Sequence, residues 1–147
     1  MDRYSTPLEH FFKSWELNMS TGNIPALIAN FAEVFMYARP QGTRSVRASD
    51  FALALPKRKQ LLDKLRCQPT VLVSLTETKL DSCFTMARTQ WCMTFAKDES
   101  DPQQILVDST YIVRTGDGVF KIVFYLAHQD IMEILNERGI LHTQITP

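Results

Sequence analysis

The feature that most constrains the fold is a hairpin signal in the C-terminal half of the chain. Two apolar runs, 105–114 and 119–127, flank the tetrapeptide TGDG at 115–118. Gly and Asp tolerate the positive φ angles that tight turns need, so the two runs are predicted to pair as antiparallel strands. Two further β-rich runs, 70–80 and 84–96, precede them. This half of the chain is therefore predicted to form an antiparallel sheet.

Helix signals dominate the N-terminal half. Thr6 is a predicted N-cap, Pro7 takes the first helical position and Glu9 completes a capping box. Gly22 stops this helix, because it can adopt positive φ. The helix carries one apolar stripe, formed by Leu8, Phe11, Phe12, Trp15 and Met19.

Four more elements complete the prediction. Asn23 caps a short second helix, and an extended segment follows at 31–40. Residues 49–66 return to helix, and Pro56 inside them predicts a kink or two short helices. A last helix starts at Asp130, where Glu133 again suggests a capping box, and ends before Gly139.

The order of elements predicts an α+β fold. N-terminal helices should cover the concave face of a curved antiparallel sheet, as in a cone-shaped barrel, with a C-terminal helix added. The 147 residues suit a single domain spanning 1–147.

Strand alternation assigns side chains to two faces. Trp91, Ser109, Tyr111 and Tyr125 share the phase that suits the concave face. The other phase ends in an apolar row, Phe120, Ile122, Phe124 and Leu126. Such a row should not face water, so we expect a homodimer formed through the convex face of the sheet. Alternatively, the C-terminal helix folds back over this row within one subunit.

Composition excludes several classes of function. Lys plus Arg equals Asp plus Glu, 16 each, which argues against a nucleic-acid partner. Three cysteines without CxxC spacing predict reduced thiols and no metal site, and no motif suggests a cofactor. The N-terminus does not resemble a secretory signal, and no apolar run approaches the roughly 20 residues of a membrane span. We therefore expect a soluble, cytoplasmic protein with no membrane contact.

Three segments together resemble the nuclear transport factor 2-like (NTF2-like) superfamily, whose fold is also called the cystatin-like α+β cone. WELNMSTGNIPAL (15–27) resembles its first two helices and the turn between them. FAEVFMYARPQG (31–42) resembles its first strand and loop, and YIVRTGDGVFKIVFYLAH (111–128) its final hairpin. The resemblance covers nearly the whole chain and implies a fold rather than an activity, since this architecture hosts many functions.

The superfamily includes polyketide cyclases and ketosteroid isomerases. The isomerase resemblance would require a tyrosine, a carboxylate base and a neutral acid in the cone. The matching positions here fall near Trp15, Arg39 and Tyr111. An indole and a guanidinium cannot replace a phenol and a carboxylate, so the comparison implies that this chain is not that isomerase.

The preferred hypothesis is that an apolar cone binds a small hydrophobic molecule. An enzyme of the lyase or isomerase type acting in the same cone, and a non-catalytic assembly or regulatory module whose cone is simply filled, remain alternatives. The candidate ligand-binding residues are Phe12, Trp15, Phe31, Tyr37, Trp91, Ser109, Tyr111 and Tyr125.

Catalytic candidates are weaker, because no spacing pairs them with a second group. His128 is a possible general acid or base near neutral pH, and Asp50 is a carboxylate candidate. The basic segment 56–66 is interpreted mainly as a solvated helix face, since the overall charge is zero.

Overall fold

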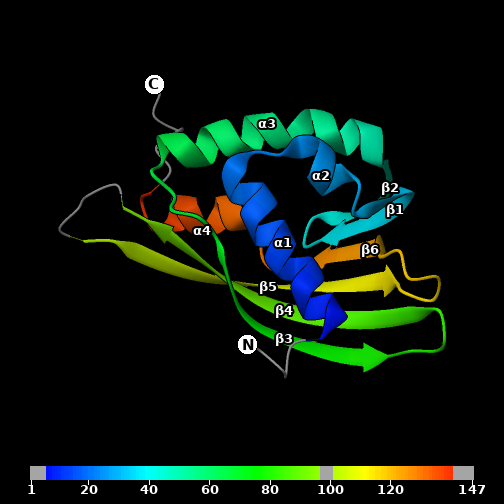
Figure 1. The fold of residues 1–147 in the computed structure, drawn as a ribbon. Helices are drawn as coiled ribbons and strands as arrows, with labels where there is room; N and C mark the ends of the chain where they lie inside the picture. The colour runs from blue at the N-terminus through cyan, green and yellow to red at the C-terminus, as the bar shows by residue number, and fades with distance from the viewer. Residues whose placement is uncertain (1–5, 97–100, 141–147) are drawn as a thin grey trace.

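The computed structural model describes residues 6–96 and 101–140. Four helices and six strands make up this part of the chain (Figure 1). None of its helices is long and apolar enough to span a membrane. In chain order the elements are α1 (Pro7–Thr21), α2 (Ile24–Ile28), β1 (Phe31–Arg39), β2 (Gly42–Arg47), α3 (Ala48–Lys64), β3 (Val71–Lys79), β4 (Phe84–Phe95), β5 (Gln103–Arg114), β6 (Lys121–Ala127) and α4 (Ile131–Glu137).

The helix ends follow the local signals in the sequence. The Thr6 hydroxyl accepts a hydrogen bond from the Glu9 amide at 3.0 Å, and this fixes the start of α1. Gly22 ends α1 with φ +69°. Asn23 caps α2 through the Ala26 amide, and Asp130 caps α4 through the Met132 and Glu133 amides. These predictions are confirmed.

All six strands form one curved, unclosed sheet in the order β2-β1-β6-β5-β4-β3. Every neighbouring pair is antiparallel except β1 and β6, which run parallel. The cone is therefore open, with β2 and β3 as its edge strands. β2 pairs with β1 as a hairpin and carries no strand signal in the sequence, so it was not predicted.

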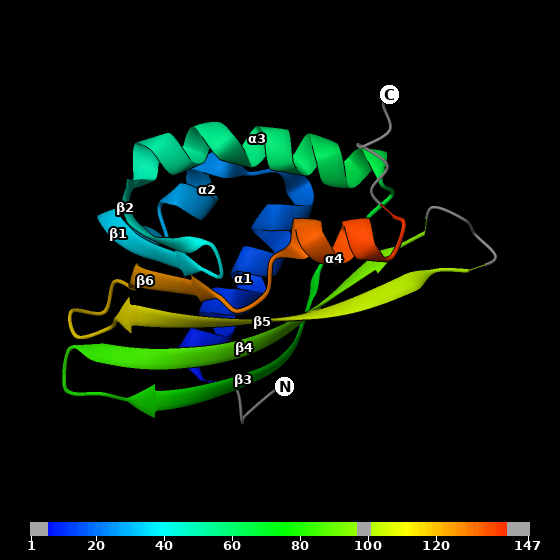
Figure 2. The ribbon, with the colours of Figure 1, turned by 180° about the vertical axis from the view of Figure 1, so that it is seen from behind.

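The helices lie on the concave side of the sheet (Figure 1). α1 crosses the sheet, and α3 runs along the open top of the cone above β1 and β2. The reverse view shows α4 below α3, beside the far ends of β4 and β5 (Figure 2). α3 is a single helix with Pro56 on its exposed side, so the alternative of two short helices is wrong.

Two hydrophobic clusters hold these layers together. The larger joins α1, α2 and α3 to the concave face of the sheet, around Phe12, Trp15 and Phe35. The smaller packs Leu135 of α4 against Met93 and Ile105, with leucines of α3 beside them. α4 therefore does not cover the Phe120–Leu126 row, and that alternative is wrong.

A bulge in β6 also changes the predicted faces. Ile112 of β5 pairs with Phe124, but the next residue, Val113, pairs with Ile122, so Val123 is extra. Ile122 is therefore turned into the core and is fully buried. Phe120 likewise packs against Phe11 of α1, with ring centroids 5.7 Å apart. The predicted convex row is thus reduced to Phe124 and Leu126.

Candidate ligand pocket

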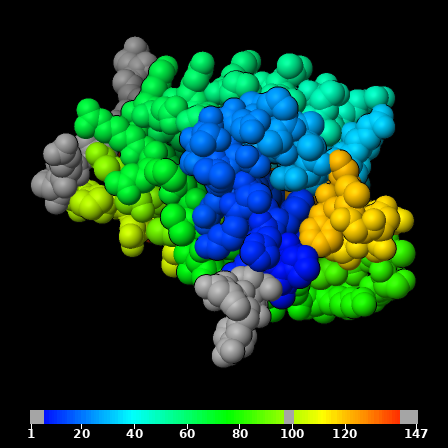
Figure 3. All heavy atoms as spheres, viewed as in Figure 1, coloured from blue at the N-terminus to red at the C-terminus, as the bar shows by residue number. Residues whose placement is uncertain are grey.

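A cavity of about 610 Å³ opens between α3 and the β1–β2 hairpin, and residues of α1 and α2 also line it. The atoms of these two helices cover the middle of the face seen in Figure 3. This volume lies within the range of small-molecule sites, about 300–1,000 Å³. Its lining combines aromatic rings with three arginines. The lining residues are Trp15, Met19, Leu27, Phe31, Val34, Tyr37, Arg44, Ser45, Val46, Arg47, Asp50, Phe51, Ala54, Leu55, Arg58 and Tyr125.

Local geometry explains why these residues converge. Arg44 pairs with Tyr37 across the β1–β2 hairpin, so the two side chains share one face of the sheet. On α3, Asp50, Ala54 and Arg58 recur every four residues and form one stripe along the helix. The edge hairpin and α3 thus supply the polar groups of the cavity.

Three tyrosines form a row across the sheet. Tyr37 of β1, Tyr125 of β6 and Tyr111 of β5 are direct cross-strand partners. The ring centroids of Tyr37 and Tyr125 are 5.1 Å apart, and those of Tyr125 and Tyr111 are 4.9 Å apart. This row links the large cavity to a smaller one of about 80 Å³, which Trp91, Ser109 and Tyr111 line.

The polar groups around the small cavity are hydrogen-bonded. The Trp91 indole donates to the Thr89 hydroxyl at 2.8 Å, and that hydroxyl donates to the Ser109 carbonyl oxygen at 3.0 Å. Burial raises the pKa of Tyr111 well above its ordinary value. Burial also raises the pKa of Tyr125, although the Arg58 guanidinium opposes this. Both hydroxyls therefore keep their protons at neutral pH.

Most of the predicted ligand-binding residues do reach a cavity. Trp15, Phe31, Tyr37 and Tyr125 line the large one. A second group, Trp91, Ser109 and Tyr111, lines the small one together with Trp15 and Tyr125.

Phe12 is the exception among the predicted ligand-binding residues. It is fully buried and lines none of the cavities described here. Its ring packs against Trp15, Trp91 and Tyr111, with centroid distances of 4.9–6.3 Å. Phe12 therefore belongs to the packed core beside these cavities, because the apolar stripe of α1 that faces the cone also supplies its core.

The two catalytic candidates, Asp50 and His128, lie in different parts of the molecule. Asp50 is exposed at the start of α3 and belongs to the lining of the large cavity. His128 follows β6 and lies against the opposite face of the sheet, where its Nε2 atom is 2.7 Å from the Thr110 hydroxyl. It lines none of the cavities described here, so it does not join Asp50 in one site.

The three arginines of the cavity were not predicted from the sequence. Arg44 and Arg47 belong to the unpredicted strand β2, and Arg58 lies in the segment interpreted as solvated. The spacing of Asp50, Ala54 and Arg58 was the available signal for a shared helix face.

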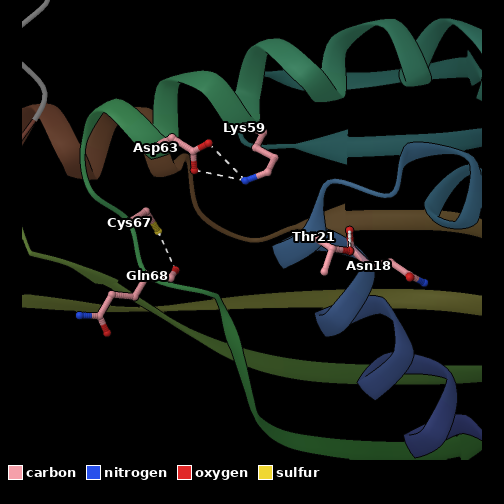
Figure 4. Close-up of polar contacts among 6 residues, drawn as sticks. All are labelled: Asn18, Thr21, Lys59, Asp63, Cys67 and Gln68. Atoms are coloured by element: carbon pink, nitrogen blue, oxygen red, sulfur yellow. Dashed lines mark hydrogen bonds and ion pairs between the residues drawn. The ribbon is translucent and has the colours of Figure 1, made fainter.

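A third hollow of about 180 Å³ lies between the end of α1 and α3. Figure 4 shows the Lys59–Asp63 ion pair on α3 near Cys67, whose thiol donates to the Gln68 carbonyl oxygen at 3.3 Å. Burial raises the pKa of Cys67 to about 11. Within residues 6–96 and 101–140, no group of His, Cys, Asp and Glu is placed to hold a metal ion.

No protein-family model and no protein of curated function matches this sequence. Solved structures do match its fold. An NTF2-like protein with a cystatin-like fold from Novosphingobium aromaticivorans has a TM-score of 0.69 at 14% identity, over 91% of this chain and 86% of its own. An NTF2-like protein of unknown function from Shewanella oneidensis has a TM-score of 0.66 at 16% identity, over 83% of this chain and 96% of its own.

One similar structure is an enzyme subunit. The β subunit of benzoate 1,2-dioxygenase from Burkholderia mallei has a TM-score of 0.66 at 9% identity, over 86% of this chain and 91% of its own. At these identities the likeness concerns the fold. The chain has the α+β, cystatin-like fold of NTF2-like proteins, and this confirms the predicted fold class. The same fold carries proteins of unknown function and an enzyme subunit, so activity must be argued from the site.

Proposed function

We propose that this chain binds a small hydrophobic molecule in the 610 Å³ cavity between α3 and the β1–β2 hairpin. The observation that carries the proposal is an unfilled cavity of ligand size with an aromatic wall. The rings of this wall come from Trp15, Phe31, Tyr37, Phe51 and Tyr125. Rings of this kind offer a large, rigid contact area to an apolar ligand.

A variant that fills the cavity tests the proposal. Ala54 lines the cavity and is exposed, so the indole of Ala54→Trp can occupy the space without disturbing the core. The fluorescent probe N-phenyl-1-naphthylamine is neutral and apolar. We expect it to bind the wild-type chain and to lose at least about tenfold in affinity in Ala54→Trp.

Leu53→Trp is the matched control. Leu53 neighbours Ala54 on α3, but its side chain points outward and is 73% exposed. The Leu53→Trp variant should therefore bind the probe with the same affinity as the wild type. Equal affinity in the wild type and in Ala54→Trp, with both chains folded by circular dichroism, would mean that the cavity is not the binding site.

We also propose that the convex face of the sheet forms a homodimer. Met86, Ile112, Phe124 and Met36 are consecutive cross-strand partners on four neighbouring strands, and they form a continuous apolar band. Met36 is 39% exposed in the single chain. A band of this kind is suited to a two-fold interface in which the same patch serves both copies.

Light scattering during size-exclusion chromatography tests the dimer. We expect twice the mass of the chain at micromolar concentration, and the monomer mass for Phe124→Arg. Leu53→Arg, which adds the same charge on α3, should remain dimeric. A monomeric wild type at that concentration contradicts this proposal and leaves ligand binding unaffected.

A further inference from the structure

We propose that the ligand of the large cavity is an apolar organic acid, with a hydrophobic body against the aromatic wall and one anionic head group on Arg58. This inference rests on the proposed function and names the chemical class of its ligand. It follows from where Arg58 lies and from the absence of a partner for it in the described part of the chain.

Arg58 is placed at the junction of the cavities. It lines the large cavity beside Tyr125, the small cavity beside Tyr111, and the hollow beside Cys67. Its guanidinium lowers the pKa of both Tyr125, which lines the large cavity, and Cys67, which lines the hollow. A charge in this position is directed at the interior of the cone as well as at solvent.

The carboxylates near Arg58 are engaged elsewhere or lie far away. Asp63 pairs with Lys59 at 3.2 Å. Glu16 accepts a hydrogen bond from the Leu72 amide and lies 3.9 Å from Lys13. Asp50 is eight residues away on the same helix, or about 12 Å along its axis.

Among the described residues, no carboxylate is therefore paired with Arg58. Within residues 6–96 and 101–140, no ion pair and no side-chain hydrogen bond involves it. Arg58 is exposed as a whole residue, but it also borders the aromatic wall of the cavity, where water screens a charge less than in bulk solvent, so its guanidinium is suited to pair with an anion there. A carboxylate or sulfonate would supply the missing charge.

The Tyr125 hydroxyl provides a second donor to the same head group. Tyr125 lines both the large and the small cavity with Arg58. Its pKa is raised by burial, so the hydroxyl remains protonated at neutral pH and can donate. An anion held by a guanidinium and a phenol would be oriented with its apolar body toward Trp15, Phe31 and Phe51.

Two further arginines favour the approach of an anion. Arg44 and Arg47 line the same cavity from β2, and both are exposed. With Arg58 they outnumber the one lining carboxylate, Asp50, so the lining carries a formal charge of 3 − 1 = +2. A cavity whose lining has a net charge of one sign raises the local concentration of ligands of the opposite sign.

A pair of probes that differ mainly in charge tests this inference. 8-Anilinonaphthalene-1-sulfonate carries the same ring system as N-phenyl-1-naphthylamine with one sulfonate added. We expect the wild type to bind the sulfonate more tightly than the neutral probe. Arg58→Met should weaken the sulfonate about tenfold or more and leave the neutral probe within about twofold.

The controls separate this inference from the proposed function. Lys57→Met removes one positive charge from the neighbouring position of α3, which lines none of the cavities, and should change neither affinity. Added salt should weaken binding of the sulfonate alone. If Ala54→Trp blocks both probes but Arg58→Met affects them equally, the anion site is wrong and the hydrophobic pocket stands. If Ala54→Trp blocks neither, the pocket itself is wrong.

Discussion

Tyr111 and Tyr125 stack face to face on neighbouring strands, with ring centroids 4.9 Å apart and an angle of 25° between their planes. They are cross-strand partners in β5 and β6, and the bulge at Val123 lies just beyond them. Tyr125 meets the large cavity, while Tyr111 lies 2% exposed beneath Phe12 and Trp15. This pair therefore connects the large cavity to the core.

The stacked pair predicts a loss of stability at alkaline pH. Burial raises the pKa of both hydroxyls in the folded chain, whereas the unfolded chain titrates near the ordinary value of about 10. The unfolded state therefore releases these protons first, and the free energy of unfolding decreases as the pH rises above about 10. Below that pH the stabilisation is fully present.

Urea denaturation from about pH 8 to pH 11 measures this effect. The wild type should lose stability steeply toward the upper limit. Tyr125→Phe removes one of the two phenols and should show a shallower decrease. Equal slopes for the two chains would mean that the Tyr125 hydroxyl titrates alike in the folded and unfolded states.

Thr89 is predicted to stabilise the floor of the small cavity. Its hydroxyl accepts from the Trp91 indole at 2.8 Å and donates to the Ser109 carbonyl oxygen at 3.0 Å, and all three residues are buried. Thr89→Val keeps the shape but leaves a buried donor and acceptor without their partner. We expect a loss of about 1–3 kcal/mol in the free energy of unfolding.

Thr78→Val on the exposed edge strand β3 is the control, and it should cost much less. Chemical denaturation of both variants at neutral pH provides the measurement. A Thr89→Val chain as stable as the wild type would indicate that the indole finds another acceptor, for which the Tyr111 hydroxyl is a candidate because Trp91 lies within its hydrogen-bonding reach.

Gly116 is required because the backbone of Ser82 and Cys83 passes close to it, and not because of its φ angle. A Cβ atom there would lie 2.9 Å from the Cys83 Cα atom and 3.0 Å from the Ser82 carbonyl oxygen, both of which belong to the backbone. Gly116→Ala should therefore cost about 1–3 kcal/mol of stability. Asp117→Ala in the same turn loses only an exposed ion pair with Arg114 and should cost under about 1 kcal/mol. Thermal unfolding compares the two, and similar costs would contradict the steric argument.

The local features of the fold were readable from the sequence. The caps at Thr6, Asn23 and Asp130 and the stop at Gly22 each depend on residues within a few positions of one another. The positive φ predicted for the hairpin turn occurs at Gly118. Signals of this kind do not require knowledge of the tertiary structure.

The bulge in β6 could not be read in the same way. Residues 122–127 are all apolar, so alternation gives no mark of the extra residue at Val123. A one-residue shift then moves Ile122 from the predicted outer face into the core. The dimer proposal accordingly depends on Phe124 and its neighbours on other strands, and no longer on the whole predicted row.

The polar half of the pocket was missed for a related reason. β2 is an exposed edge strand whose residues 42–47 include one aliphatic side chain, so no hydrophobic pattern marks it. Arg58 lies in a basic segment that was interpreted as a solvated helix face, although its side chain lines the cavity. Both errors arise because a charged side chain at the mouth of a cavity is exposed on one side and buried on the other.

The Cys67 thiol is predicted to react slowly with alkylating reagents in the folded chain. Burial raises its pKa to about 11, from an ordinary value of 9.0, so its thiolate fraction at pH 8 is about a hundredfold lower than that of an ordinary cysteine. Its alkylation by iodoacetamide, followed by mass spectrometry of the peptides, should be correspondingly slow in the folded chain and should reach the ordinary rate in urea. Arg58 lowers the pKa of Cys67, so Arg58→Met should slow this alkylation further, whereas Asp63→Asn, which removes a charge that raises the pKa, should speed it. An Arg58→Met chain alkylated as fast as the wild type, or faster, would place the guanidinium away from this thiol and away from the junction of the cavities.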